Sequence, residues 1–163
     1  MQGRYRQALE FLAAAPSFQP VQGMASDGKQ THTLIETARA RLALDAGDPG
    51  SALKILPASE PPKTALGSDY WRTRGEAMCA SGKLTDGLTE MLSVIDIRAA
   101  DRYEFDPTLA RDRAVAGLCA LAVGQPALAK ALAKLARDAF KSQPGVSPYF
   151  KAPLLRLEQG LRH

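Results

Sequence analysis

Residues able to bind a metal ion or to act as strong nucleophiles are few in this sequence. Its 163 residues include two cysteines and two histidines, Cys79, Cys119, His32 and His163. A zinc site needs three or four such ligands at short, characteristic spacings, and this set has no such spacing. Each cysteine lies within an apolar pattern of helical period, so we interpret both as small buried hydrophobic residues, the alternative being a disulfide. We expect no metal site and no cofactor.

Motifs for enzymatic catalysis are also missing. The segment Gly47–Lys54, GDPGSALK, contains glycines and a lysine without the spacing of a phosphate-binding loop. No G-x-S-x-G element is present, and no histidine stands near a candidate nucleophile. Three acidic and two aromatic residues gather in Ala100–Pro107, ADRYEFDP. We interpret that segment as a helix end followed by a cap, the alternative being a local binding edge. We expect that the chain is not an enzyme.

The composition is typical of a globular, helical domain. Hydrophobic residues make up 45% and charged residues 23%, and aromatic residues only 6%. Alanine and leucine dominate, which favours helix over strand. The net charge of +4 comes from 21 basic residues interleaved with 17 acidic ones, so we expect a solvated surface and no nucleic-acid partner. No apolar run approaches the roughly 20 residues that span a bilayer, so we expect no membrane insertion.

Turn signals divide the chain, read as one domain over residues 1–163, into helical segments. Candidate N-caps precede several of them: Ser68 or Asp69, Asp106 and Ser147. One buried face is expected in the first pair, formed by Leu34, Ile35, Ala38, Leu42 and Ala46. The predicted segments are a helix at 1–16, a linker at 17–32, helical pairs at 33–59, 69–99 and 107–141, and a final helix at 147–162.

Small residues recur at fixed distances from the glycines between helices. These glycines are Gly3, Gly47, Gly82 and Gly124. Seven residues before the glycine stand Ala40, Gly75 and Gly117, and five residues after it stand Ala8, Ala52, Gly87 and Ala129. Two helices joined by a tight turn can approach closely only where the crossing point carries little side chain. A repeated helical hairpin is therefore predicted.

This pattern resembles the tetratricopeptide repeat (TPR), and the resemblance covers most of residues 1–140. The best copy is Trp71–Leu92, WRTRGEAMCASGKLTDGLTEML, in which Gly75 and Gly87 stand at the expected distances from Gly82. The resemblance implies an all-α fold of antiparallel helical hairpins stacked as an α-solenoid, with about three pairs, an N-terminal half-repeat and a C-terminal capping helix. The alternative is a generic alanine-rich antiparallel helix bundle.

TPR arrays bind peptides or protein segments in a groove lined by the first helix of each pair, which implies a binding surface here. On this match the partner-binding residues are Arg41, Arg72, Glu76, Arg111 and Leu118. The three arginines suit an acidic or carboxylate-bearing segment. The sequence contains no asparagine. It therefore lacks the residues with which the chaperone-binding TPR subfamily holds a terminal carboxylate.

From the resemblance we expect a non-enzymatic protein–protein interaction module. The alternatives are a regulatory or sensory domain of a larger bacterial signalling, transcription or secretion protein, and a secretion chaperone. The aromatic C-terminal stretch is expected to cap the last pair, the alternative being a surface for self-association. The cytoplasm is the favoured location, or the periplasm if the chain is a fragment of an exported protein.

The first segment, Gly3–Pro16, matches the second half of a helical pair whose first half is missing. We therefore expect that the chain is the C-terminal part of a longer repeat protein, the alternative being a natural half-repeat cap.

Overall fold

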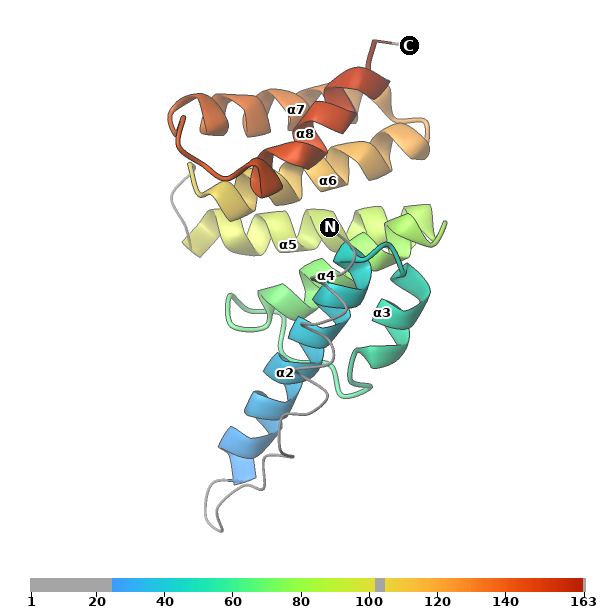
Figure 1. Ribbon diagram of the computed structural model, residues 1–163, viewed down its shortest axis with the longest axis vertical. Helices are drawn as coiled ribbons and strands as arrows, with labels where there is room; N and C mark the ends of the chain where they lie inside the picture. The colour runs from blue at the N-terminus through green and yellow to red at the C-terminus, as the bar shows by residue number, and fades with distance from the viewer. Residues whose placement is uncertain (1–24, 102–104, 163) are drawn as a thin grey trace.

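The computed structural model describes residues 25–101 and 105–162, so the predicted helix at 1–16 lies outside the described residues. Within these ranges the fold is all-α, as predicted, with seven helices and no strand (Figure 1). The helices are α2 (Ala25–Asp45), α3 (Pro49–Ile55), α4 (Ser68–Ala80), α5 (Leu84–Asp101), α6 (Pro107–Ala122), α7 (Pro126–Lys141) and α8 (Pro148–Gly160).

Helices that follow one another in the sequence pack on one another. The pairs α2–α3, α4–α5 and α6–α7 correspond to the three predicted hairpins. The first helices also touch across pairs, α2 on α4 and α4 on α6, whereas α3, α5 and α7 make no such contacts with each other within the described ranges. The side formed by α2, α4 and α6 is called the first-helix face below.

The predicted interhelix glycines end their helices in the left-handed backbone region. Gly47, Gly82 and Gly124 have φ angles of 89°, 88° and 85°, a conformation that side-chain-bearing residues adopt only with strain. Glycine also permits the crossing of α4 and α5. A Cβ atom on Gly87 would lie 2.7 Å from the backbone nitrogen of Cys79. The small residues predicted at this crossing are therefore required by the packing.

Two of the predicted caps are confirmed and one is wrong. Asp106 accepts a hydrogen bond from the Thr108 amide at 2.6 Å, and Ser147 caps α8. Helix α4 is instead preceded by Gly67, and the Ser68 hydroxyl donates to the Ala65 carbonyl at 2.6 Å. The preceding loop therefore engages this hydroxyl. Asp69 lies within the first turn and pairs with arginines described below.

Helix α2 differs from its predicted form. It begins at Ala25 rather than near residue 33, and its buried residues include Ala40, Ala43 and Leu44, while Leu34 is 52% exposed. The small side of this helix packs in one apolar cluster with Trp71 of α4. Ala38, also predicted to be buried, is exposed, so the buried side of α2 is rotated from the predicted face toward Thr37, Ala40, Ala43 and Leu44.

The two cysteines form a disulfide that joins α4 to α6. The Cα atoms of Cys79 and Cys119 are 5.7 Å apart, and no cysteine is free among the described residues. Their interpretation as separate buried hydrophobic residues was therefore wrong. The bond forms because α4 and α6, which are not adjacent in the sequence, pack against each other. Helical periodicity alone does not predict which helices pack together.

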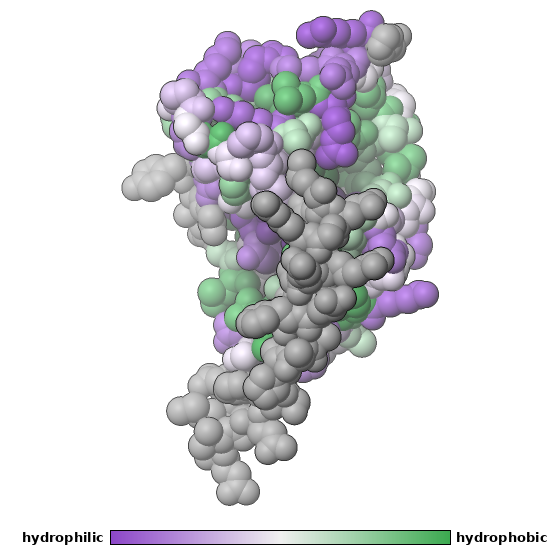
Figure 2. All heavy atoms as spheres, viewed as in Figure 1, coloured by the Kyte–Doolittle hydropathy of each residue, from purple (hydrophilic) through white to green (hydrophobic). Residues whose placement is uncertain are grey.

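The outer side of α7 is hydrophilic and basic. Lys130, Lys134 and Lys141 are exposed there, and Figure 2 shows hydrophilic side chains gathered over the end of the molecule formed by α7 and α8. The opposite side of α7 contributes alanines and Phe140 to the core. None of the described helices combines the length and the apolar character needed to cross a bilayer.

Reduction of the Cys79–Cys119 bond should lower stability, because the bond restricts the unfolded chain. We expect reducing agent to lower the free energy of unfolding by about 2–4 kcal/mol, measured by urea denaturation. The double variant Cys79→Ser/Cys119→Ser should not respond to the reducing agent. Equal unfolding midpoints for the oxidised and reduced wild type would contradict this expectation.

Candidate functional site

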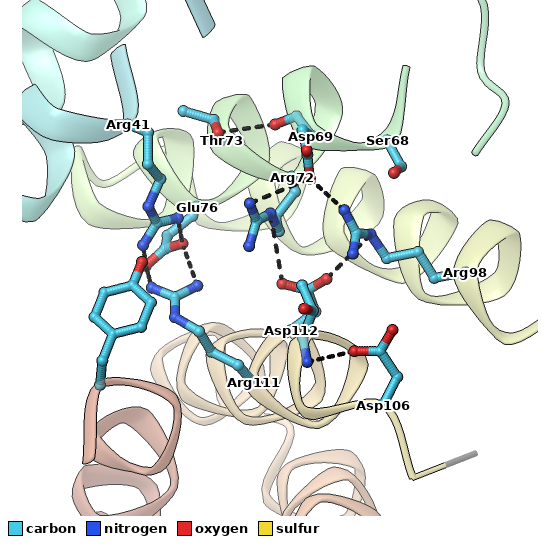
Figure 3. A network of polar contacts seen from close by, with 12 residues as sticks. Arg41, Ser68, Asp69, Arg72, Thr73, Glu76, Arg98, Asp106, Arg111 and Asp112 are labelled. Atoms are coloured by element: carbon cyan, nitrogen blue, oxygen red, sulfur yellow. Dashed lines mark hydrogen bonds and ion pairs between the residues drawn. The ribbon is translucent and has the colours of Figure 1, made fainter. Parts of the chain in front are cut away.

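A carboxylate from α4 lies between arginines of α2 and α6 on the first-helix face. Arg111 holds Glu76 with two parallel hydrogen bonds, from Nη1 to Oε2 and from Nη2 to Oε1, both 2.9 Å long. Arg41 binds the same carboxylate and also donates to Asp45, one turn further along α2, at 2.7 Å. Figure 3 shows both guanidinium groups directed at Glu76. Arg41, Glu76 and Arg111 are called the Glu76 cluster below.

Glu76 and Arg41 are both charged at neutral pH. Burial raises the pKa of Glu76, but the charges of Arg41 and Arg111 outweigh burial and bring this pKa to about 2. Burial lowers the pKa of Arg41, yet Glu76 and Asp45 more than offset that effect, so the pKa is raised. The Glu76 carboxylate is thus a permanent partner for both cations.

A second group of charges lies between α4, α5 and α6. Arg72 and Arg98 approach the fully buried carboxylate of Asp112, with Nε–Oδ distances of 3.9 and 3.4 Å. Asp69 pairs with the same two arginines (Figure 3). Neither oxygen of Asp112 has a hydrogen-bond partner within the described part of the chain. These four residues are called the Asp112 cluster below.

The poor solvation of Asp112 changes its acidity. Burial raises the pKa of this carboxyl from 3.8 to about 6, and the opposing effect of Arg72, Arg98 and Arg111 is smaller. Asp112 and Glu76 therefore have pKa values shifted in opposite directions, although both lie among arginines. The difference follows from geometry, because Glu76 accepts short hydrogen bonds and Asp112 accepts none.

Tyr149, from the first turn of α8, covers the Glu76 cluster. Its ring centroid lies 5.1 Å from the Arg111 guanidinium carbon and 6.0 Å from that of Arg41. Its hydroxyl donates to Asp45 at 3.3 Å. The ring faces attract the guanidinium charges. The last helix thus contacts the first described helix across this face.

A cavity of about 410 Å³ opens between the N-terminal half of α2, the start of α4 and the loop that joins α3 to α4. Leu34 and Leu66 contribute apolar surface and are 52% and 79% exposed. Thr37 lies against the cavity with only 6% exposure, and its hydroxyl has no hydrogen-bond partner within the described residues. The cavity therefore combines apolar surface with polar residues, among them Gln30, Ser59 and Thr64.

The predicted site residues fall into three places. Arg41, Glu76 and Arg111 meet in the Glu76 cluster, and Arg72 belongs to the Asp112 cluster. Leu118 is half-buried and packs against the apolar core. The partners Asp112 and Tyr149 were not predicted, because nothing local in the sequence signals pairing between such distant residues. The predicted acidic and aromatic edge at 100–107 lies partly outside the described residues, and Phe105 is 47% exposed.

The charges of this face are paired within the chain. Each arginine of the two clusters faces a carboxylate of the chain. Among the described residues, no three histidine, cysteine or acidic side chains come together as metal ligands.

Replacing Glu76 by glutamine should leave the buried Arg111 without its ion-pair partner and Arg41 with Asp45 alone. We expect a loss of about 3 kcal/mol in the free energy of unfolding, because removing one partner of a buried pair strands the other charges. The control is Glu158→Gln, whose carboxylate pairs with Arg137 at 2.7 Å with side-chain exposures of 24% and 45%. That change should cost less than about 1 kcal/mol. Equal losses in urea denaturation would contradict the central role of Glu76.

The raised pKa of Asp112 predicts a pH dependence of stability. The folded chain keeps this proton up to about pH 6, whereas the unfolded carboxyl ionises near 3.8. Between these values the folded state binds more protons, so stability falls as pH rises, by up to about 3 kcal/mol. Asp112→Asn should flatten this fall in urea titrations between pH 4.5 and 6.5. The lowered pKa of Glu76 makes stability rise with pH, the opposite of the effect of Asp112. Because the wild type and Asp112→Asn both contain Glu76, this effect cancels when their curves are compared. Parallel curves for the two proteins would refute the shift.

Comparison with known proteins gives no relative from which a role could be transferred. No protein-family model, curated protein or solved structure matches this chain.

Proposed function

We propose that this chain is a non-enzymatic interaction module that binds a segment of another protein on its first-helix face. The observation that carries the proposal is the open cavity between α2 and α4, with exposed Leu34 and Leu66 at its edge. Exposed apolar side chains around a cavity are typical of surfaces that receive a partner. The sequential packing of helical pairs, and the TPR resemblance of the sequence, support the same role.

The cavity suits an apolar side chain carried by a peptide. Its apolar walls are leucine, proline and tyrosine, and the polar residues Gln30, Ser59 and Thr64 at the same cavity can bond polar groups of the peptide backbone. The two acidic residues at the cavity, Glu60 and Asp69, already pair with arginines of the chain. Recognition there would therefore rest mainly on apolar contact.

The predicted preference for an acidic segment would require an exchange of partners. Arg41 and Arg111 are bound to Glu76, so a carboxylate from another protein would have to replace that side chain. The Cys79–Cys119 bond supports work in an oxidising compartment, which fits an exported protein better than a cytoplasmic secretion chaperone. A regulatory or sensory domain of a larger bacterial protein stays an alternative within this proposal.

Peptide display against the purified chain, followed by fluorescence polarisation, tests the proposal. Selected peptides should bind the wild type at least about tenfold more tightly than Leu34→Glu, because a charge at the cavity edge opposes apolar burial. The matched control is Leu155→Glu, which alters an exposed leucine of α8, 59% accessible, away from the cavity. Its affinity should equal that of the wild type. Unchanged binding to Leu34→Glu would remove the assignment to this face.

A further inference from the structure

Helix α8 does not continue the arrangement of the pairs before it. Against the pair that precedes it, α6 packs more on the second helix, α5, than on the first, α4, whereas α8 packs more on the first helix of its preceding pair, α6, than on the second, α7. Figure 1 shows α8 lying across the preceding pair. A Cβ atom on Gly117 of α6 would lie 2.4 Å from a methyl carbon of Leu157. The glycine thus accommodates α8 on the side of the molecule that carries the Glu76 cluster.

The body and the first turn of α8 are held in different ways. Pro153, Leu154 and Leu157 are buried in the body, and the latter two belong to the apolar core. The first turn contacts the Glu76 cluster through Tyr149, which is 39% exposed and makes one 3.3 Å hydrogen bond to Asp45. The body is therefore fixed by fully buried residues. The first turn is held by half-buried Phe150, which packs against the edge of the apolar core, and by the polar contacts of Tyr149 and Lys151.

Proline separates these two parts of the helix. Pro153 lies inside α8 and has no N–H, so the regular helical bond from residue 153 to the carbonyl of Tyr149 cannot form. Ahead of this turn, the exposed residues Pro144 and Gly145 connect α7 to α8. The backbone at Tyr149 therefore lacks one bond of a regular helix, so the first turn is held less firmly than Leu154 and Leu157, which are buried in the core.

We propose that the first turn of α8, Pro148–Lys151, is a clasp that closes the Glu76 cluster and opens about Pro153. In the closed state the Tyr149 ring covers Arg41 and Arg111. In the open state these guanidinium groups become accessible while the rest of the fold persists. A partner segment that reaches the Glu76 cluster must first displace Tyr149, so the clasp would regulate binding on the first-helix face. In this respect the inference rests on the proposed function.

Arginine modification by phenylglyoxal, quantified for each residue by mass spectrometry, tests the clasp on the full chain alone. Arg156 is exposed and gives the unprotected rate, and Arg98, which is 2% exposed between other helices, reports global unfolding. Tyr149→Ala should raise the modification rates of Arg41 and Arg111 at least about fivefold and leave Arg98 protected. Tyr149→Phe, which keeps the ring and loses the bond to Asp45, should give a smaller rise.

A second variant tests the hinge in the opposite direction. Pro153→Ala supplies the missing N–H, so it should stiffen the first turn and slow modification of Arg41 and Arg111 below the wild-type rates. Unchanged rates in both Tyr149→Ala and Pro153→Ala would overturn the clasp. Equal acceleration of Arg98 in Tyr149→Ala would also overturn it, because protection would then come from the whole fold. Failure of peptide binding with this protection pattern intact would count against the proposed function alone.

Discussion

One carboxylate, that of Glu76, is shared by arginines from the helices on either side of it. Arg111 is only 3% exposed, and without a counter-charge its burial would be costly. Because Glu76 also receives Arg41, the charge of α4 fixes the position of α2 and α6 together. Around this centre four guanidinium groups face four carboxylates, namely Arg41, Arg72, Arg98 and Arg111 with Asp45, Asp69, Glu76 and Asp112.

The two sides of α4 are joined to their neighbours by different kinds of contact. Helix α4 is tied to α6 by Arg72–Asp112, by Glu76–Arg111 and by the Cys79–Cys119 bond. Helix α2 has no covalent tie to α4, and the cavity lies on that side. Helix α2 is joined to α4 by the Arg41–Glu76 pair and by apolar packing against Trp71.

Local signals predicted the helical pairs well. Gly47, Gly82 and Gly124 end helices as expected, and Asp106 begins one, because turn and cap chemistry depends on neighbouring residues. The Glu76–Arg111 pair and the disulfide join residues 35 and 40 positions apart, so they depend on the relative placement of α4 and α6. The direction of α8 was hidden for the same reason, since Gly117 looked like a contact for α7 and also receives Leu157.

Local sequence signals also predicted part of the candidate site. The sequence predicted Arg41, Glu76 and Arg111 on one face from their repeat positions, and the structure brings them together.

A crystal structure of the chain at neutral pH is the most direct test of the account. It should show Glu76 within hydrogen-bond distance of both Arg41 and Arg111, with Tyr149 over the guanidinium groups. Either guanidinium turned to solvent, away from Glu76, would contradict the account.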